Sequence, residues 1–157
     1  GTNFPLDFNG YSTESCSIVK AGVLNYIPIA PQISKTLNQP ITGSNFNGSW
    51  FPDLKLHSGT KTFKELIKEV NHGIYLVMSG DLVMGNILQG DMSGTIQAGF
   101  LIENGEIKGR IKNRSLGFNF YEALGDRLLG LSQESIRFGG SHFTESPYVL
   151  VDDIRIS

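Results

Sequence analysis

The 157-residue chain lacks several features that would point to a particular chemistry or compartment. Its one cysteine, Cys16, rules out a disulfide within the chain and lies in a short apolar run, where a small packed side chain is expected rather than a nucleophile. No apolar run approaches the ~20 residues that a membrane-spanning helix needs, and no signal peptide is visible. We therefore expect a cytoplasmic protein with no membrane association. The chain begins without methionine and runs directly into a strand-like pattern, so we also expect an excised domain of a longer protein.

An excess of positive charge is also missing, since the formal net charge is −2. A nucleic-acid-binding protein is expected to show a basic patch or stripe. The densest basic stretch comprises Lys108, Arg110, Lys112 and Arg114. Their alternate spacing predicts one water-facing side of a strand. We interpret this stretch as a solvated sheet face, and we expect no direct contact with nucleic acid.

Clustered metal ligands and catalytic motifs are absent from the sequence. His57, His72 and His142 lie far apart, so no HExxH pair is present. No nucleophile elbow or phosphate-binding glycine loop occurs. Asp152 and Asp153 are adjacent, and in a strand they would point to opposite faces, which makes a paired acid and base improbable. The residues therefore predict no catalytic, metal or cofactor-binding site, and no cofactor. A zinc site assembled from the three histidines stays an alternative, because distant ligands leave no spacing in a sequence.

The 19 glycines and short apolar runs indicate tight turns between strands. The segment Ser17–Ile27 predicts a hairpin around Lys20-Ala21-Gly22. The segment Gly99–Ile111 predicts a second hairpin, whose Asn104-Gly105 pair suits a type I′ turn. The two hairpins resemble each other. This indicates either an internal duplication or two uses of a common turn.

Three short helices and several further strands complete the prediction. One helix follows Pro31, with Ile33 and Leu37 on one face. The second has a Thr62/Glu65 capping box and a stop at Gly73. The third begins near Asn119, and its apolar face comprises Tyr121, Leu124, Leu128 and Leu131. The predicted strands are Ile74–Met78 (expected to be buried on both faces), Leu82–Leu88 (broken by Gly85), Thr95–Ile102, Tyr148–Val151 and Ile154–Ile156. We predict a single domain over 1–157 with a strand-rich α+β fold, in which about three short helices accompany an antiparallel, mixed or barrel-like sheet.

A series of segments carries a resemblance that extends over nearly the whole chain. The segments are Gly22–Tyr26, Thr42–Asn45, Leu54–Gly59, Phe63–Ile67, Gly73–Tyr75, Gly90–Ser93, Gly99–Ile107, Gly117–Asn119 and the strand that contains Pro147. In this order and spacing, the chain resembles the carboxy-terminal region of the TldD/PmbA (TldE) family. These metallopeptidase-like proteins are also known as modulators of DNA gyrase.

The resemblance implies a role without a metal site in this chain. The family's HExxxH zinc motif lies upstream of the matching region and does not occur here. In TldD-like members a cysteine near the end completes the zinc site, but the matching stretch Ser135–Ser141 contains none. The chain is therefore more similar to the PmbA/TldE type, which lacks the metal and pairs with a TldD-like subunit. Whether the chain is enzymatic by itself is left undecided.

Three functions follow as hypotheses. The first is a carboxy-terminal structural and peptide-holding domain of a PmbA/TldE-like subunit, which acts in proteolysis or peptide maturation as a homodimer or a heterodimer with a TldD-like subunit. The second is a self-standing β-rich module that binds carbohydrate or peptide through Tyr11, Trp50 and Phe51. The third is a hydrolase whose site is assembled from distant residues.

Overall fold

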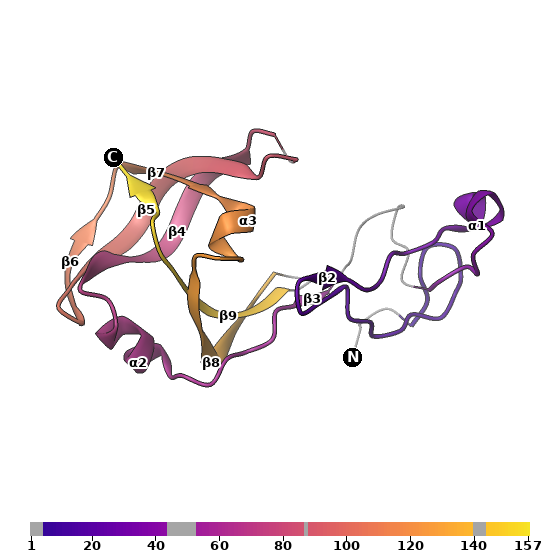
Figure 1. Ribbon diagram of the computed structural model, residues 1–157, viewed down its shortest axis with the longest axis horizontal. Helices are drawn as coiled ribbons and strands as arrows, with labels where there is room; N and C mark the ends of the chain where they lie inside the picture. Colours follow the sequence, from indigo (N-terminus) through magenta and orange to yellow (C-terminus); the bar gives the residue numbers. More distant parts are fainter. Residues whose placement is uncertain (1–4, 44–52, 87, 140–143) are drawn as a thin grey trace. The chain divides into compact units, whose positions relative to one another are not determined.

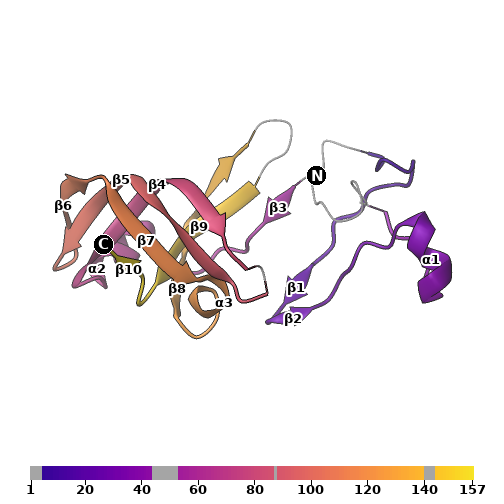
Figure 2. The same ribbon diagram turned by 90° about the horizontal axis from the view of Figure 1, so that it is seen from above.

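The computed structural model describes residues 5–43, 53–86, 88–139 and 144–157, which divide into two compact units (Figures 1 and 2). Unit 1 consists of Gly1–Leu56 and Arg137–Glu145. Unit 2 consists of His57–Ile136 and Ser146–Ser157.

A five-stranded sheet forms most of unit 2. Its strands are β4 (His72–Met84), β5 (Asp91–Glu103), β6 (Glu106–Ile111), β7 (Arg114–Asn119) and β10 (Arg155–Ile156). The order is β10-β7-β5-β4, and every pairing is antiparallel. β4 follows one edge of β5, whereas β7 and β6 share the other edge. β7 pairs with the first half of β5 and β6 pairs with the second half.

Both predicted hairpins are present. In unit 1, β1 (Val19–Lys20) pairs with β2 (Val23–Leu24). In unit 2, β5 pairs with β6. The two connecting residues have positive φ in each turn, with values of 50° and 77° for Ala21 and Gly22 and of 50° and 75° for Asn104 and Gly105. This is the geometry of a type I′ turn, which matches the right-handed twist of the flanking strands.

The three predicted helices are confirmed, and all of them are short. They are α1 (Pro31–Leu37), α2 (Phe63–Lys68) and α3 (Phe120–Ala123). The capping box of α2 is present, because Glu65 N donates to Thr62 Oγ1 at 3.2 Å and Thr62 N donates to Glu65 Oε2 at 2.6 Å. α2 ends before Gly73, which belongs to β4 and is not a helix stop.

The third helix is much shorter than predicted. A Cβ at Gly125 would lie 2.8 Å from the Tyr121 carbonyl oxygen, so the chain turns tightly there. Leu128 and Leu131, which were assigned to the apolar face of this helix, instead belong to β8 (Leu128–Phe138). The helical spacing of these apolar residues is therefore overridden by the pairing of β8 with β9.

A second, three-stranded sheet has the order β3-β9-β8, where β3 is Leu54–Lys55 and β9 is Thr144–Val151. β3 runs parallel to the first residues of β9. The pairings are thus mixed, and no closed barrel forms within the described ranges. The predicted strand-rich α+β fold with antiparallel and mixed sheets is confirmed. Among the helices of these ranges, none is both long and apolar enough to span a membrane.

Among the described residues, the buried apolar side chains all belong to unit 2, and they are Leu66, Ile96, Ile102, Leu116 and Ala123. Ser132 is also fully buried. Its Oγ donates to Glu134 O at 2.6 Å and accepts from Tyr148 N at 2.8 Å, so its burial leaves no orphaned hydroxyl. The Phe63 ring lies beside Tyr148 and Tyr75, with centroid distances of 4.3 and 5.1 Å. Burial and the bond to Tyr148 raise the pKa of Tyr75.

Two predictions about strand faces are wrong. The run Ile74–Met78 is not buried on both faces, because Val77 and Met78 are each 52% exposed. β4 lies at the end of the sheet and has bulges on both sides of Met78, so part of the run faces solvent. The four basic residues do not share one strand face, since Lys112 lies in the connection between β6 and β7. All four are exposed, as expected.

We predict that Gly105→Ala destabilises unit 2. Gly105 has φ of 75°, and a Cβ there would lie 3.0–3.4 Å from the Lys68 backbone. The left-handed conformation costs a residue with a Cβ about 1–2 kcal/mol, so the free energy of unfolding in urea should fall by about that amount. Gly109→Ala is the control, because Gly109 lies on the same hairpin but a Cβ there would meet open space. This variant should change the free energy of unfolding by less than about 0.5 kcal/mol. Equal losses in both variants would contradict the turn assignment.

Candidate functional site

The residues considered for chemistry from sequence do not converge in the part of the chain that the structure describes. His57 is exposed. His72 is also exposed, and it lies at the first position of β4 and not at a helix end. His142 lies outside the described residues. Within the described ranges, no three His, Cys, Asp or Glu side chains lie close enough to hold one metal ion. Cys16 is half-buried rather than packed in a core, and desolvation, with a smaller effect of Glu14, raises the pKa of its thiol.

The aromatic residues of the ligand-binding alternative cannot be compared as a group. Trp50 and Phe51 lie outside the described residues. Tyr11 is described, and it is 39% exposed in unit 1. No observation on Tyr11 indicates a stacking surface, so this alternative stays a prediction from sequence.

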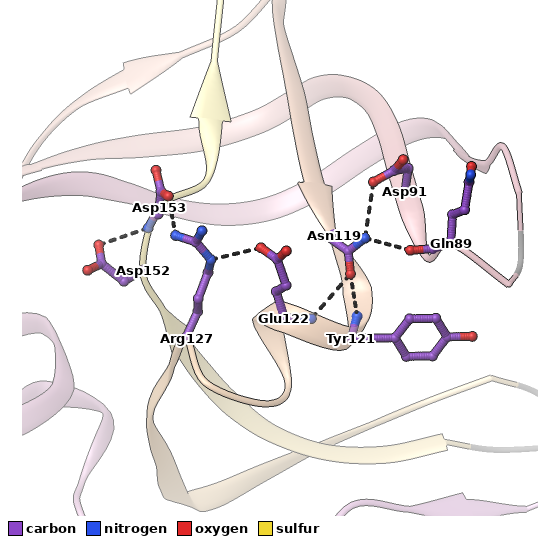
Figure 3. Close-up of polar contacts among 8 residues, drawn as sticks. All are labelled: Gln89, Asp91, Asn119, Tyr121, Glu122, Arg127, Asp152 and Asp153. Atoms are coloured by element: carbon purple, nitrogen blue, oxygen red, sulfur yellow. Dashed lines mark hydrogen bonds and ion pairs between the residues drawn. The ribbon is translucent and has the colours of Figure 1, made fainter.

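Two of the segments that carry the family resemblance meet at one end of the five-stranded sheet. Gly90–Ser93 leads into β5 and Gly117–Asn119 ends β7, and the register pairs Asp91 with Asn119 and Ser93 with Gly117. Phe120 N, at the start of α3, donates to Gly90 O at 2.8 Å. We call this region the polar junction. It comprises Gln89–Asp91, Asn119–Glu122, Arg127 and Asp152–Asp153 (Figure 3).

Asn119 is the centre of the polar junction. Its Nδ2 donates to Gln89 O at 2.6 Å and to Asp91 Oδ1 at 3.1 Å. Its Oδ1 accepts from the backbone N–H groups of Tyr121 and Glu122 at 3.1 and 3.2 Å, which makes it the N-cap of α3 (Figure 3). The Asn119 side chain therefore links the start of β5, the end of β7 and the first turn of α3.

Gly90 has a local reason to be glycine. Its φ is 77°, and a Cβ would lie 2.5 Å from Tyr121 Cδ2. A side chain at this position would displace the tyrosine ring as well as strain the backbone. The glycine thus allows the ring of Tyr121 to pack against the start of β5.

Arg127 forms the second half of the polar junction. Its Nε donates to Glu122 Oε2 at 3.0 Å, and its Nη1 pairs with the Asp153 carboxylate (Figure 3). These two carboxylates, Asp153 first, raise the pKa of the guanidinium above its ordinary value. Asp152 and Asp153 lie in the connection between β9 and β10, not within a strand. Because Asp153 binds Arg127 and Asp152 Oδ1 accepts from Asp153 N at 2.8 Å, the two do not form an acid and base pair.

A shallow depression of about 190 Å³ lies over the polar junction. The charged residues that line it are Asp91, Glu122, Asp153, Arg127 and Arg155. Each carboxylate is bound to a neighbouring amide or to Arg127, and neither a serine nor a cysteine lines the depression. The arrangement can fix the ends of β5, β7 and β10, but it shows no nucleophile with a base beside it.

A second candidate site is the free edge of β4. In the described part of the chain this strand pairs only with β5, and its other edge pairs with no strand. Asp81, with φ of 50°, lies in the irregular stretch between Gly80 and Val83. The exposed apolar residues of β4 are Leu76, Val77, Met78, Leu82 and Val83. Sequence reasoning missed this edge because the same apolar run is typical of a buried strand.

We predict that Asn119→Asp disrupts the polar junction although it keeps the oxygen that caps α3. The variant loses the amide donor to Gln89 and Asp91 and brings a second carboxylate beside Asp91. The free energy of unfolding at pH 7 should fall by about 1 kcal/mol. Adding Asp91→Asn should recover most of the loss, because the new amide can donate to the new carboxylate. A double variant no more stable than Asn119→Asp would show that the two side chains are not coupled.

Comparisons with known proteins agree with these features. Residues 1–157 match the family described as PmbA/TldA metallopeptidase C-terminal domain. A protein of Archaeoglobus fulgidus named "Metalloprotease" is 30% identical over 135 residues, which are 81% of this chain and 31% of that protein.

Solved structures show the same fold. A Thermotoga maritima protein described as a candidate modulator of a DNA gyrase has a TM-score of 0.83 and 26% identity, and the match covers 98% of this chain and 35% of that one. TldE from Thermococcus kodakarensis has a TM-score of 0.84 and 20% identity, and the match covers 98% of this chain and 36% of that one. The chain spans about a third of the length of these relatives. It belongs to the PmbA/TldD metallopeptidase family and corresponds to the carboxy-terminal domain of that family.

Proposed function

We propose that this chain is the carboxy-terminal domain of a PmbA/TldE-like subunit in a TldD-type metallopeptidase. In this role it holds an extended peptide along the free edge of β4 and contacts a TldD-like subunit, which carries the metal. The metal site is assigned to the other subunit because the stretch Ser135–Ser141, which matches the cysteine-bearing stretch of TldD-like members, contains no cysteine.

The free edge of β4 is the observation that carries the proposal. An edge strand presents unpaired N–H and C=O groups, to which an extended peptide can add as a further strand. Proteins commonly protect such edges with lysine, proline, bulges or a covering element. β4 has bulges beside Met78 but contains neither lysine nor proline, and between Leu76 and Met78 it exposes only apolar side chains, which suit contact with an apolar peptide.

The irregularities of β4 define where such a peptide can lie. From Gly73 to Leu76 the strand is in regular register with β5, and the first shift follows Leu76. Val77 has no Cα partner on β5, so its substitution should disturb the β4–β5 ladder least. This makes Val77 the most useful position for a test of the edge.

We predict that Val77→Lys weakens binding of a labelled octapeptide of alternating valine and serine about tenfold, which is about 1.4 kcal/mol. The charge places a strongly hydrated group in the edge contact. Leu129→Lys is the control, because Leu129 is 55% exposed on β8 against 52% for Val77. Binding is measured by fluorescence anisotropy, with circular dichroism to confirm that both variants are folded.

A second peptide sharpens this measurement. N-methylation of every other residue removes the hydrogen-bond donors from one edge of the peptide. Binding to the unaltered chain should then be lost. Equal binding of the methylated peptide, or equal losses in the two lysine variants, would rule out strand addition at β4.

The partner is tested separately by sedimentation velocity of this chain with a TldD-like protein. We predict a complex at micromolar concentration that Val77→Lys leaves intact, because the proposed peptide contact and the partner contact are separate. If neither a TldD-like protein nor the octapeptide binds at micromolar concentration, the proposed function is wrong.

A further inference from the structure

Three positively charged residues at the bend between β6 and β7 have no countercharge within the chain. They are Arg110 on β6, Lys112 in the connection and Arg114 on β7, and we call them the basic corner. None of the three forms an ion pair or a side-chain hydrogen bond with a residue that the structure describes. The neighbouring Lys108 differs, because its Nζ pairs with the Glu106 carboxylate.

The rest of the chain offers no carboxylate to neutralise the basic corner. No aspartate or glutamate lies between Glu106 and Glu122, and none occurs in the stretches outside the described residues. The carboxylates of unit 1 are Asp7, Glu14, Asp53 and Glu145. Each of these is engaged elsewhere. The missing countercharge therefore does not depend on how the two units are placed.

The register fixes the spacing of the two arginines. β6 and β7 follow the same edge of β5 (Figure 2). Arg110 lies opposite Phe100. Arg114 lies opposite Ile96. Because Phe100 and Ile96 are four positions apart on one strand, the two arginines share a face of the sheet, with Cα atoms about 13 Å apart.

The backbone of the basic corner is also held in place. Asn113, with φ of 57°, forms the bend, and its N–H donates to Ile96 O at 3.2 Å. Ser115 N, just after the bend, donates to Ser157 O at 2.7 Å. The three cations are thus carried by a backbone that needs no rearrangement when a partner binds, which lowers the entropic cost of association.

We propose that the basic corner binds an extended acidic segment of a partner polypeptide, in which carboxylates recur at alternate positions. In an extended segment, residues i and i+4 lie on one face about 13 Å apart, which matches the spacing of Arg110 and Arg114. The carboxylate at i+2 then lies nearest Lys112. A guanidinium binds a carboxylate through two parallel hydrogen bonds, so two arginines at a fixed spacing favour aspartate or glutamate.

This site is separate from the free edge of β4. β4 pairs with one edge of β5, whereas β6 and β7 occupy the other edge. A peptide strand added to β4 would lie three strand spacings, or about 14 Å, from β6 and β7. The inference therefore does not rest on the proposed function, and the two contacts can form at the same time.

A nucleic acid fits the basic corner less well than an acidic polypeptide. The formal net charge of the chain is −2, which repels a long polyanion. Proteins that bind single-stranded nucleic acid combine a positive groove with aromatic side chains on which the bases stack. No aromatic residue lies between Ile107 and Leu116. The basic corner therefore provides charge without a stacking surface.

The test measures binding of a labelled octapeptide of alternating glutamate and serine to this chain by fluorescence anisotropy. We expect a dissociation constant below about 1 mM that rises with salt, because exposed ion pairs are screened. The triple variant Arg110→Gln, Lys112→Gln, Arg114→Gln should weaken binding at least about tenfold, since each exposed pair contributes little alone. If the triple variant does not fold, Arg110→Gln alone should weaken binding about twofold to threefold.

A matched variant controls for net charge. Lys20→Gln, Lys35→Gln, Lys64→Gln removes the same total charge from exposed lysines on β1, α1 and α2 that form no ion pair with described residues. This variant should weaken binding less than about twofold, because only long-range attraction is lost. Circular dichroism confirms that the variants are folded.

Two further probes test the spacing and the class of partner. An octapeptide of four glutamates followed by four serines places neighbouring carboxylates on opposite faces, so it should bind at least about threefold more weakly. An octamer of thymidylate should bind more weakly than the alternating peptide. Four results would each overturn the proposal: no binding of the alternating peptide, equal losses in the two triple variants, equal affinity of the two peptides, or tighter binding of the oligonucleotide.

Discussion

The pairing of β5 on both of its edges is the constraint on which the rest of unit 2 depends. β4 follows one edge, β7 and β6 occupy successive halves of the other, and Ile96 and Ile102 are buried on this strand. Because side chains alternate between faces, a shift of one residue would expose both isoleucines. It would also separate Asp91 from Asn119, so the register that builds the core also builds the polar junction.

Features encoded within a few residues could be predicted from the sequence. The Asn104-Gly105 turn, the Thr62/Glu65 capping box and the helix start at Pro31 each depend on a contact over four residues or fewer, and the structure contains all three. The family could also be recognised, because its segments keep their order even where each alone is weak. The strand-rich α+β class followed from these local features.

Features set by distant contacts could not be predicted. The apolar run in β4 suited a buried strand, and only its place at the sheet edge exposes Val77. Asn119 reaches Asp91 across 28 positions, and Arg127 reaches Asp153 across 26. No spacing rule connects such pairs. The segments Gly90–Ser93 and Gly117–Asn119 could be recognised by their resemblance to the family. That they pair with each other could be seen only once the order of the strands in the sheet was known.

The two hairpins use the same turn geometry with different residues, and the local sequence therefore supports the two turns to different degrees. Asparagine tolerates the positive φ of the first turn position, as in Asn104, whereas alanine at Ala21 adopts it at a cost of about 1–2 kcal/mol. The turn of the β5–β6 hairpin is therefore favoured by its own sequence. The turn of the β1–β2 hairpin is not, so its stability depends on contacts beyond the turn.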